Sequence, residues 1–365
     1  MSEWQTFCLK DLGKIVGGAT PPTNNPKNYG NKIAWITPKD LSTLQGRYIK
    51  KGSRSISRLG FKSCSCVLLP KHAILFSSRA PIGYVAIAKK RLCTNQGFKS
   101  IIPNKKIYFE FLYYLLKYHK DNISNIGGGT TFKEVSGATL GLFEVKIPPT
   151  YYEQQKIART LSVLDRKIEN NHKINELLHT LAYKIYEYYF KYKPKNAKLE
   201  QIIIENPKSS IMVKNAQKTQ DKYPFFTSGD NILSYPKAII DGRNCFLNTG
   251  GNAGIKFYVG KASYSTDTWC ICANEFSDYL YLLLSSIKNH INQSFFQGTS
   301  LKHLQKNLLK KYPIYMPSAH EIKKFNQIMM PLLTLISINT RTSKKLEQIR
   351  DFLLPLLLKQ QVKPK

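Results

Sequence analysis

The sequence repeats itself at a nearly constant spacing, and this feature limits the fold more than any other. At an offset of 168 residues, positions 111–116 (FLYYLL) align with 279–284 (YLYLLL). At an offset of 169, positions 145–148 (VKIP) align with 314–317 (IYMP). An ordered series of matches at one spacing indicates an internal duplication. We therefore expect the 365 residues to form two copies of one arrangement.

Each copy ends in a predicted long helix. Thr150 with Glu153, and Ser318 with Glu321, fit the capping box, in which a hydroxyl and a glutamate satisfy the first amides of a helix. Apolar residues then recur in alternating steps of four and three for about 40 residues, or roughly 60 Å of helix. A narrow stripe on so long a helix predicts that the two helices pair, while the direction of pairing stays open.

The expected seam of this helix pair has two buried asparagines, which would fix its register. The seam positions are Ile157, Leu161, Leu164, Ile168, Asn171, Leu178, Leu181, Phe325, Met329, Leu332, Ile336, Asn339, Leu346 and Ile349. The segments between the helices contain short β-type runs separated by Gly and Pro, which predicts an α+β fold. The predicted domains are 1–149 (globular), 150–195 (helix), 196–317 (globular) and 318–365 (helix).

Positive charge is concentrated in one part of the chain. The formal net charge is +32, from 55 Lys and Arg against 23 Asp and Glu. Residues 41–109 contain fourteen Lys or Arg and no acid, which favours contact with the phosphates of nucleic acid. Residues 207–274 hold eight Lys or Arg and four Asp, so we expect the first globular domain to bind DNA more strongly through charge.

The candidate DNA contacts come from both stretches. In the first they are Lys50, Lys51, Arg54, Arg58, Lys62, Ser77, Ser78 and Arg79. In the second, weaker set they are Lys222, Lys237, Arg243, Lys256 and Lys261. The cations are expected on phosphates, whereas the turn-like segment 77–79 (SSR) is the strongest candidate for a base contact.

Motifs for catalysis or metal binding are missing from the sequence. Residues 254–262 have the wrong spacing and residue type for a phosphate-binding loop, and neither Asn-Pro-Lys segment completes a methyltransferase motif. We interpret Cys64, Cys66, Cys270 and Cys272 as core residues, because zinc ligands are usually spaced more widely. No secretion signal or apolar run of about 20 residues is evident, so a cytoplasmic protein without a membrane segment is expected.

Several motifs resemble those of type I restriction–modification specificity subunits. They are 17–22 (GGATPP), 33–40 (IAWITPKD), 94–97 (TNQG), 147–149 (IPP), 153–158 (EQQKIA) and 164–168 (LDRKI). The resemblance extends over nearly the whole chain, although residues 321–324 (EIKK) depart from it in the second half.

This resemblance implies a chain without catalytic activity whose two target-recognition domains each read half of a bipartite DNA target. It also implies an antiparallel helix spacer, on which methyltransferase subunits dock, and separate restriction subunits that drive translocation and cleavage. S-adenosylmethionine, ATP and Mg²⁺ would then belong to those partners. A first alternative is the recognition subunit of a related bifunctional system with fused nuclease and methyltransferase. A second is a nuclease or RNA-modifying enzyme with an unrecognised site.

Overall fold

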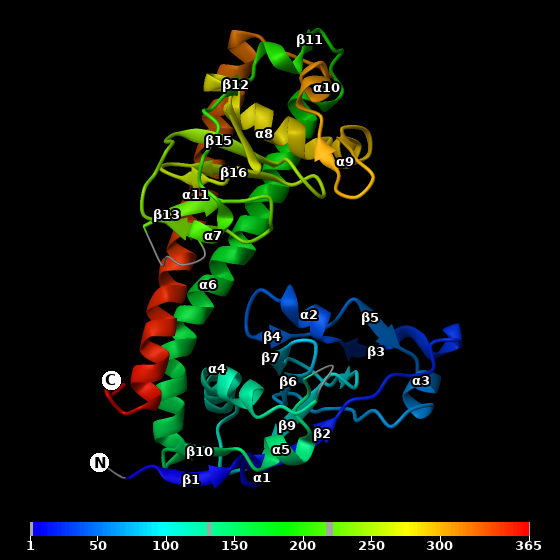
Figure 1. Ribbon diagram of the computed structural model, residues 1–365, viewed down its shortest axis with the longest axis vertical. Coiled ribbons are helices and arrows are strands. Elements are labelled where there is room, and N and C mark those ends of the chain that lie inside the picture. Colours follow the sequence, from blue (N-terminus) through cyan, green and yellow to red (C-terminus); the bar gives the residue numbers. More distant parts are fainter. Residues whose placement is uncertain (1–2, 130–132, 217–221, 365) are drawn as a thin grey trace. The chain divides into compact units, whose positions relative to one another are not determined.

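The computed structural model describes residues 3–129, 133–216 and 222–364 (Figure 1). It has the α+β class that the sequence predicts, and the chain separates into two compact units. The first unit consists of Met1–Asn170 with Lys345–Lys365, and the second unit is Asn171–Lys344. No helix in the described part of the chain is long and apolar enough to span a membrane.

Two long helices contribute residues to both units. Helix α6 (Tyr151–Tyr186) has 36 residues and α11 (Ala319–Leu358) has 40. The predicted caps are confirmed. The Ser318 hydroxyl accepts from the Glu321 amide at 3.3 Å, while the Glu321 carboxylate accepts from the Ser318 amide at 2.9 Å. At the start of α6 the Glu153 amide likewise donates to Thr150 Oγ1, at 3.2 Å.

The first unit contains a five-stranded sheet of order β2-β9-β6-β7-β4. The first unit as a whole has the strands β1 (Gln5–Cys8), β2 (Gly13–Gly17), β3 (Tyr29–Ile36), β4 (Tyr48–Ile49), β5 (Arg54–Ile56), β6 (Ile74–Ser78), β7 (Ile82–Ala88), β8 (Cys93–Thr94), β9 (Lys99–Pro103) and β10 (Glu144–Ile147). Its shorter helices are α1 (Leu9–Leu12), α2 (Pro38–Ser42), α3 (Arg58–Lys62), α4 (Phe109–Asn125) and α5 (Gly137–Gly141). Ile74 and Phe76 pack with Phe111 of α4, whereas Leu75 enters a separate cluster on the opposite face. This period of two means that both faces of the sheet are covered.

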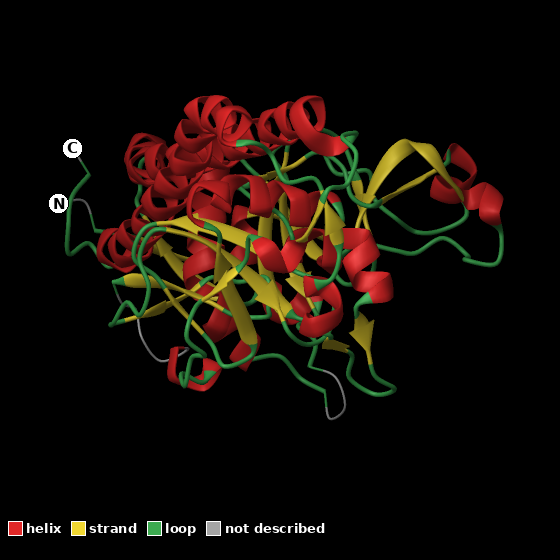
Figure 2. Cartoon of the chain, turned by 90° about the horizontal axis from the view of Figure 1, so that it is seen from above, coloured by secondary structure: helices red, strands yellow, loops and turns green. Residues whose placement is uncertain are grey.

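Strands β3 and β5 of a smaller sheet, of order β5-β3-β8, belong to a lobe that projects from the rest of the first unit in both views (Figures 1 and 2). We define this basic lobe as residues 26–36 and 54–68, which include β3, β5 and α3. Its own small core is built around Trp35, Ile56 and Cys66.

The second unit also combines a sheet with helices, in the strand order β12-β18-β15-β16. Its strands are β11 (Ala197–Lys198), β12 (Ile204–Glu205), β13 (Tyr223–Phe226), β14 (Leu233–Tyr235), β15 (Arg243–Asn248), β16 (Ile255–Val259), β17 (Ser263–Tyr264), β18 (Thr268–Cys272), β19 (Phe296–Gln297), β20 (His303–Leu304) and β21 (Pro313–Ile314). Its shorter helices are α7 (Val213–Ala216), α8 (Ser277–Ser286), α9 (Lys288–Ser294) and α10 (Lys306–Lys310). The main core brings α8 together with β15, β18, α6 and α11.

Within the second unit, α6 and α11 run in opposite directions. Asn171 Nδ2 donates to Ser343 Oγ at 3.1 Å. The ring of Tyr189, in the π-helical turn Glu187–Lys191 that follows α6, lies 6.0 Å from the ring of Phe325. Residue numbers therefore rise along one helix as they fall along the other. In the first unit, Ile157 and Leu161 share a core cluster with Leu354 and Leu357, and Arg350 pairs with Asp165.

The packed face of this helix pair departs from the expected seam at two positions. Leu181 and Ile349 are 48% and 39% exposed, while Ala182 and Tyr186 are buried. A strict heptad assumes 3.5 residues per turn, and a helix with 3.6 drifts about 20° from that pattern per heptad. On α6 the inward position therefore moves by one residue, from Leu181 to Ala182. The remaining seam residues are buried (Ile157, Leu161, Ile168, Asn171, Phe325, Met329, Ile336) or half-buried (Leu164, Leu178, Leu332, Asn339, Leu346).

Candidate nucleic-acid interface

Three of the predicted phosphate contacts lie together on the basic lobe. Arg54 is on β5, and Arg58 and Lys62 are on α3, and all three side chains are exposed. Arg54 also lies over the ring of Tyr29, 5.9 Å from its centroid. Because β5 and α3 follow one another directly in the chain, the three cations lie close together on the surface of the lobe.

Local contacts fix α3 on this lobe. The Gly60 amide donates to Ser57 Oγ at 3.0 Å, which caps the helix, and the Ser57 amide donates to the Asn28 carbonyl at 2.9 Å. A β-carbon at position 60 would lie 2.0 Å from that same carbonyl oxygen, so only glycine fits there. The charge-bearing helix is thus held against the loop before β3 by backbone contacts.

The basic lobe contains no acidic residue. Its cations are Lys27, Lys32, Arg54, Arg58 and Lys62, and residues 26–36 and 54–68 include neither Asp nor Glu. Lys27 and Lys32 are exposed but lie outside the 41–109 window, so they are not among the contacts predicted from the sequence. Residues 12–39 also contain no Asp or Glu, and this second acid-free run is the sequence pattern that would have predicted Lys27 and Lys32 as contacts. A surface with one sign of charge attracts a polyanion without internal neutralisation.

Lys50 and Lys51 follow β4 and are exposed. Within the described part of the chain, neither they nor the lobe residues Arg54, Arg58 and Lys62 form an ion pair. These five predicted contacts are therefore available to an external anion.

The predicted base contact at residues 77–79 is corrected by the structure. Ser77 and Ser78 are fully buried on β6. Ser77 Oγ donates to the Pro81 carbonyl and accepts from the Tyr84 amide, both at 2.8 Å, so it holds the β6–β7 turn. Arg79 remains partly exposed but pairs with Glu134 at 3.3 Å. Two adjacent serines before a turn look the same in sequence whether they face solvent or the core.

One cation of the acid-free window is not on the surface at all. Arg47 is 3% exposed, and its guanidinium lies 3.1 Å from both Glu110 and Glu169. Its backbone amide also donates to Glu169, at 2.9 Å. Because Glu110 starts α4 and Glu169 lies on α6, this arginine fixes the β-rich part of the first unit to the long helix. Its acidic partners lie beyond residue 109, so the composition of residues 41–109 alone does not reveal that this arginine is paired.

In the second unit, three predicted contacts are exposed and two are not. Lys222, Lys237 and Lys261 are exposed, and the last two line one open pocket beside Tyr223. Arg243 instead binds the buried Asp278 at 2.6 Å and Thr334 Oγ1 at 2.9 Å. Arg243 is thus a correction, since it anchors β15 to α8 and α11 rather than facing DNA.

Lys256 is the second correction in this unit. Its ammonium donates to the Thr227 carbonyl at 2.8 Å and to Asn248 at 3.3 Å. Burial lowers its pKa, which is the expected effect of removing a cation from water. This lysine therefore supports neighbouring loops, and Lys222, Lys237 and Lys261 remain as the exposed candidates.

Two of the four cysteines predicted as core residues, Cys66 and Cys270, are buried, whereas Cys64 and Cys272 are half-buried. Cys93 and Cys245 are also buried, and burial raises the pKa of Cys93 to about 11. Among the described residues, no cluster of three or more His, Cys, Asp or Glu could hold a metal ion.

Comparisons with known proteins identify the family. The model of the type I restriction modification DNA specificity domain matches residues 1–180 and 195–348. The type I restriction enzyme MjaIX specificity subunit of Methanocaldococcus jannaschii is 33% identical, covering 98% of this chain and 93% of that protein. The HindI specificity subunit of Haemophilus influenzae is 30% identical, covering 46% of this chain and 37% of that protein.

A solved structure shares the fold. The crystal structure of the type I restriction-modification system S subunit from M. genitalium matches with a TM-score of 0.65 and 18% identity, covering 97% of this chain and 96% of that one. On the family match and the relative with 33% identity, this chain belongs to the type I restriction–modification specificity subunits. It is therefore the DNA-specificity component of such a system and not its catalytic part, as the sequence predicts.

Proposed function

We propose that the two units are the products of an internal duplication, and that each reads one half of a bipartite DNA target. The supporting observation is that residues 168 positions apart make equivalent contacts in the two units. Glu110 and Asp278 lie in the first turns of α4 and α8, and each binds an arginine of its own unit. Their partners, Arg47 and Arg243, attach the β-rich part to the helices in each case.

A second pair of equivalent positions extends this argument to the long helices. Glu169 on α6 accepts the Arg47 amide at 2.9 Å, and Ser337 on α11 accepts the Val259 amide at 3.0 Å. Each β-rich part thus docks on the long helix that follows it in sequence. We take α6 and α11 as the antiparallel coiled-coil spacer between two recognition domains, with the domain boundaries expected from the sequence.

Binding would then divide between charge and base reading. The basic lobe neutralises phosphates and sets the register on the duplex, without distinguishing sequences. Side chains on neighbouring loops read base edges in the major groove. Lys222, Lys237 and Lys261 give the second unit a smaller version of the same contact.

The outer face of the helix pair supports docking of methyltransferase subunits. In the second unit, Ile174, Leu177 and Leu181 of α6 are 41%, 71% and 48% exposed. Leu335 and Ile338 of α11 are 41% and 42% exposed. In the antiparallel pair they lie at the same level as these residues of α6. Exposed apolar residues with helical spacing favour a partner helix. In this proposal the partners include restriction subunits, and S-adenosylmethionine, ATP and Mg²⁺ bind to those partners.

Selection from random duplexes tests the proposal. The chain with its methyltransferase partner should enrich a sequence of two short specified segments separated by an unspecified gap. A chimaera in which another family member's residues replace 1–149 should change only one of the two segments. Enrichment of one contiguous motif, or a change in both segments, would contradict two independent reading domains.

A further inference from the structure

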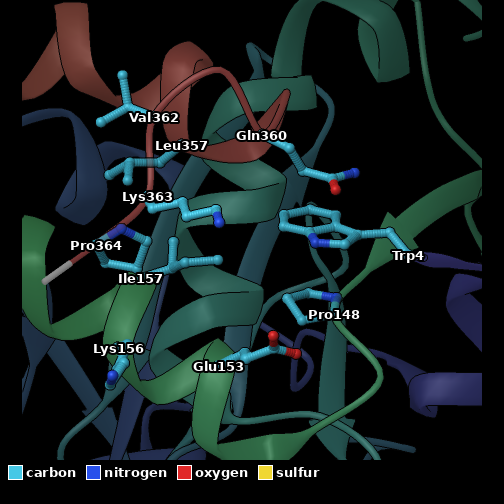
Figure 3. A pocket seen from close by; sticks show the side chains of 10 residues that line it. All are labelled: Trp4, Pro148, Glu153, Lys156, Ile157, Leu357, Gln360, Val362, Lys363 and Pro364. Carbon is cyan, nitrogen blue, oxygen red and sulfur yellow. The ribbon is translucent and has the colours of Figure 1, made fainter. Parts of the chain in front are cut away.

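The shape of the first unit narrows the search for its base-reading side chains. The major groove is about 12 Å wide and 8.5 Å deep, and it admits a helix or a two-stranded β-ribbon. Strands β3 and β5 form such an antiparallel pair on the projecting basic lobe (Figures 1 and 2). By contrast, Trp4, Ile157 and Leu357 line a hollow of about 280 Å³ at the start of α6, which is too small for a duplex (Figure 3). The basic lobe is therefore the part of this unit whose shape suits a groove.

A three-residue bulge interrupts the ribbon of the basic lobe. Tyr29 and Ile33 both pair with Ile56 of β5, so residues 30–32 (GNK) have no partner on that strand. All three residues of the bulge are exposed. Extra residues in one strand of an antiparallel pair re-aim the side chains and are over-represented beside functional sites. The fold thus presents a short polar segment to solvent at one place along the ribbon.

Contacts with the core of the lobe fix both ends of the bulge. The Tyr29 hydroxyl donates to the Pro21 carbonyl at 3.2 Å, and the Tyr29 ring lies 6.2 Å from that of Trp35. Ile33 packs against the same small core. Because both flanking residues are held, a side chain on the bulge starts from a defined position, and this preorganisation lowers the entropy cost of a base contact.

The bulge lies beside cations of the lobe. A β-carbon at Gly30 would lie 3.8 Å from the β-carbon of Ser57, the residue that caps α3. Arg58 begins that helix, and Arg54 lies over the ring of Tyr29, which precedes the bulge. Phosphate contacts fix the register of a duplex on a protein. Arginines at this place would therefore hold base edges within reach of the bulge.

Asn31, in the middle of the bulge, is the single exposed amide of the basic lobe, all of whose residues are described. The lobe's other amide, Asn28, is 2% exposed, and its Nδ2 donates to the Pro22 carbonyl at 2.9 Å. Within the described part of the chain, no hydrogen bond engages the Asn31 side chain. In the major groove adenine offers an acceptor at N7 and a donor at N6, which an amide matches with its own donor and acceptor. Lys and Arg side chains only donate, so the cations of the lobe cannot form that pair.

We infer that Asn31 reads an adenine in the half of the DNA target bound by the first unit. Its Nδ2 donates to N7 of the base and its Oδ1 accepts from N6, while Arg54 and Arg58 hold the neighbouring phosphates. This inference rests on the proposed DNA-reading function, and it assigns one residue and one base pair within that function.

Selection from random duplexes, with the full chain and its methyltransferase partner, tests the inference. The natural chain should specify at least one A·T pair in the segment that the 1–149 chimaera changes. Asn31→Ala should relax one such pair and leave every other specified position unchanged. Asn122→Ala, which removes an exposed amide from α4 of the same unit, should enrich the natural motif. A first segment without a specified A·T pair, or an unchanged motif with Asn31→Ala, would overturn the inference.

Affinities then separate base reading from a phosphate contact. A duplex with 7-deazaadenine at the relaxed position lacks N7 but keeps the base pair. By fluorescence anisotropy, the natural chain should bind it about tenfold more weakly than the unmodified duplex. Asn31→Ala should bind both duplexes equally, because the two changes remove the same contact. Its salt slope should match that of the natural chain, since an uncharged side chain releases no counterion. An equal loss on the modified duplex for both proteins would overturn the contact with N7.

An isosteric variant separates base reading from a structural role. Asn31→Asp keeps the shape of the side chain but replaces its donor with an acceptor, so the preference for adenine should disappear. Both variants change an exposed side chain, so their thermal unfolding midpoints should match that of the natural chain. A retained preference for adenine in Asn31→Asp would overturn the inference. Lowered midpoints in both variants would do so too, because they would identify a structural role instead.

The two proposals can fail independently. If the natural chain enriches a split sequence that Asn31→Ala reproduces at every position, only this inference falls. If the natural chain enriches one contiguous motif, from which Asn31→Ala loses one A·T pair, the contact of Asn31 stands without bipartite reading.

Discussion

The two units attach their β-rich parts to the helices at equivalent positions but with different chemistry. The first unit uses Arg47 among three carboxylates, those of Glu110, Asp165 and Glu169. The second uses Arg243 on Asp278, and a hydroxyl, Ser337, stands where the first has Glu169. The comparison suggests that the place of docking is constrained while the donors and acceptors are free to change. An ionic network and a partly neutral one should therefore respond differently to substitution.

The largest expected effect comes from Arg47→Met. Removing this buried guanidinium takes the cation away from the buried Asp165 and the half-buried Glu110 and Glu169, so the free energy of unfolding should fall by about 3–5 kcal/mol. Urea denaturation of the full chain measures this, with exposed Lys89→Met as the control, expected within about 0.5 kcal/mol. A loss similar to that of the control would show that the network does not hold the first unit together.

Arg243→Met should cost less, about 2–3 kcal/mol, because it removes the cation from one carboxylate, whereas Arg47 pairs with three. Burial already raises the pKa of Asp278, so this group can take up a proton when its partner is lost. The same denaturation series measures both variants. A larger loss for Arg243→Met than for Arg47→Met would reverse the comparison.

The basic lobe predicts a difference in DNA binding between the units. The triple variant Arg54→Ala, Arg58→Ala and Lys62→Ala should weaken binding to all sequences. It should also reduce the slope of log K against log salt by up to about 0.9 per lost phosphate contact. Lys222→Ala, Lys237→Ala and Lys261→Ala should have a smaller effect. Fluorescence anisotropy at several salt concentrations measures the slopes, with Lys89→Ala, Lys90→Ala and Lys105→Ala as the charge-matched control. Equal slopes in all three variants would remove any special role of the lobe.

The smallest expected effect is a pH dependence of opposite sign in the two units. Asp40 accepts from the Thr37 and Ser53 amides at 2.8 and 2.7 Å. Although burial opposes it, the balance with these hydrogen bonds leaves its pKa below the ordinary value of 3.8. Its contribution is thus present above pH 3.8 and is lost as the pH falls through the folded-state pKa. Burial raises the pKa of Asp278 above 3.8, so its protonated form favours the folded state, and this contribution declines as the pH rises.

Two asparagine variants separate these terms by unfolding between pH 3 and pH 6. The stability deficit of Asp40→Asn, about 1 kcal/mol, should shrink on acidification. The deficit of Asp278→Asn should grow over the same range. Parallel changes in both variants would contradict the assigned directions.

Periodicity and local chemistry predicted much of the fold. They failed where the outcome depends on which side chains are buried. Capping residues and helix-period stripes are encoded within a few positions, so α6 and α11 were predictable at Thr150 and Ser318. The exact inward face was not, because a small mismatch in period accumulates and turns Leu181 outward. Charge statistics located the basic lobe but could not separate exposed Arg58 from buried Arg47, whose partners are distant in sequence.

The division of the long helices between the units has a consequence for synthesis on the ribosome. The first unit needs residues from 345 onward to cover Ile157 and Leu161, whereas the second unit is complete at Lys344. At about 5–20 residues per second, the last helical turns of the first unit emerge roughly 10–35 s after Asn170. The part of the chain that is made first is therefore the part that finishes folding last. During that interval the apolar residues at the start of α6 are not yet covered by the end of α11, and they offer a binding surface to a chaperone or a neighbouring nascent chain.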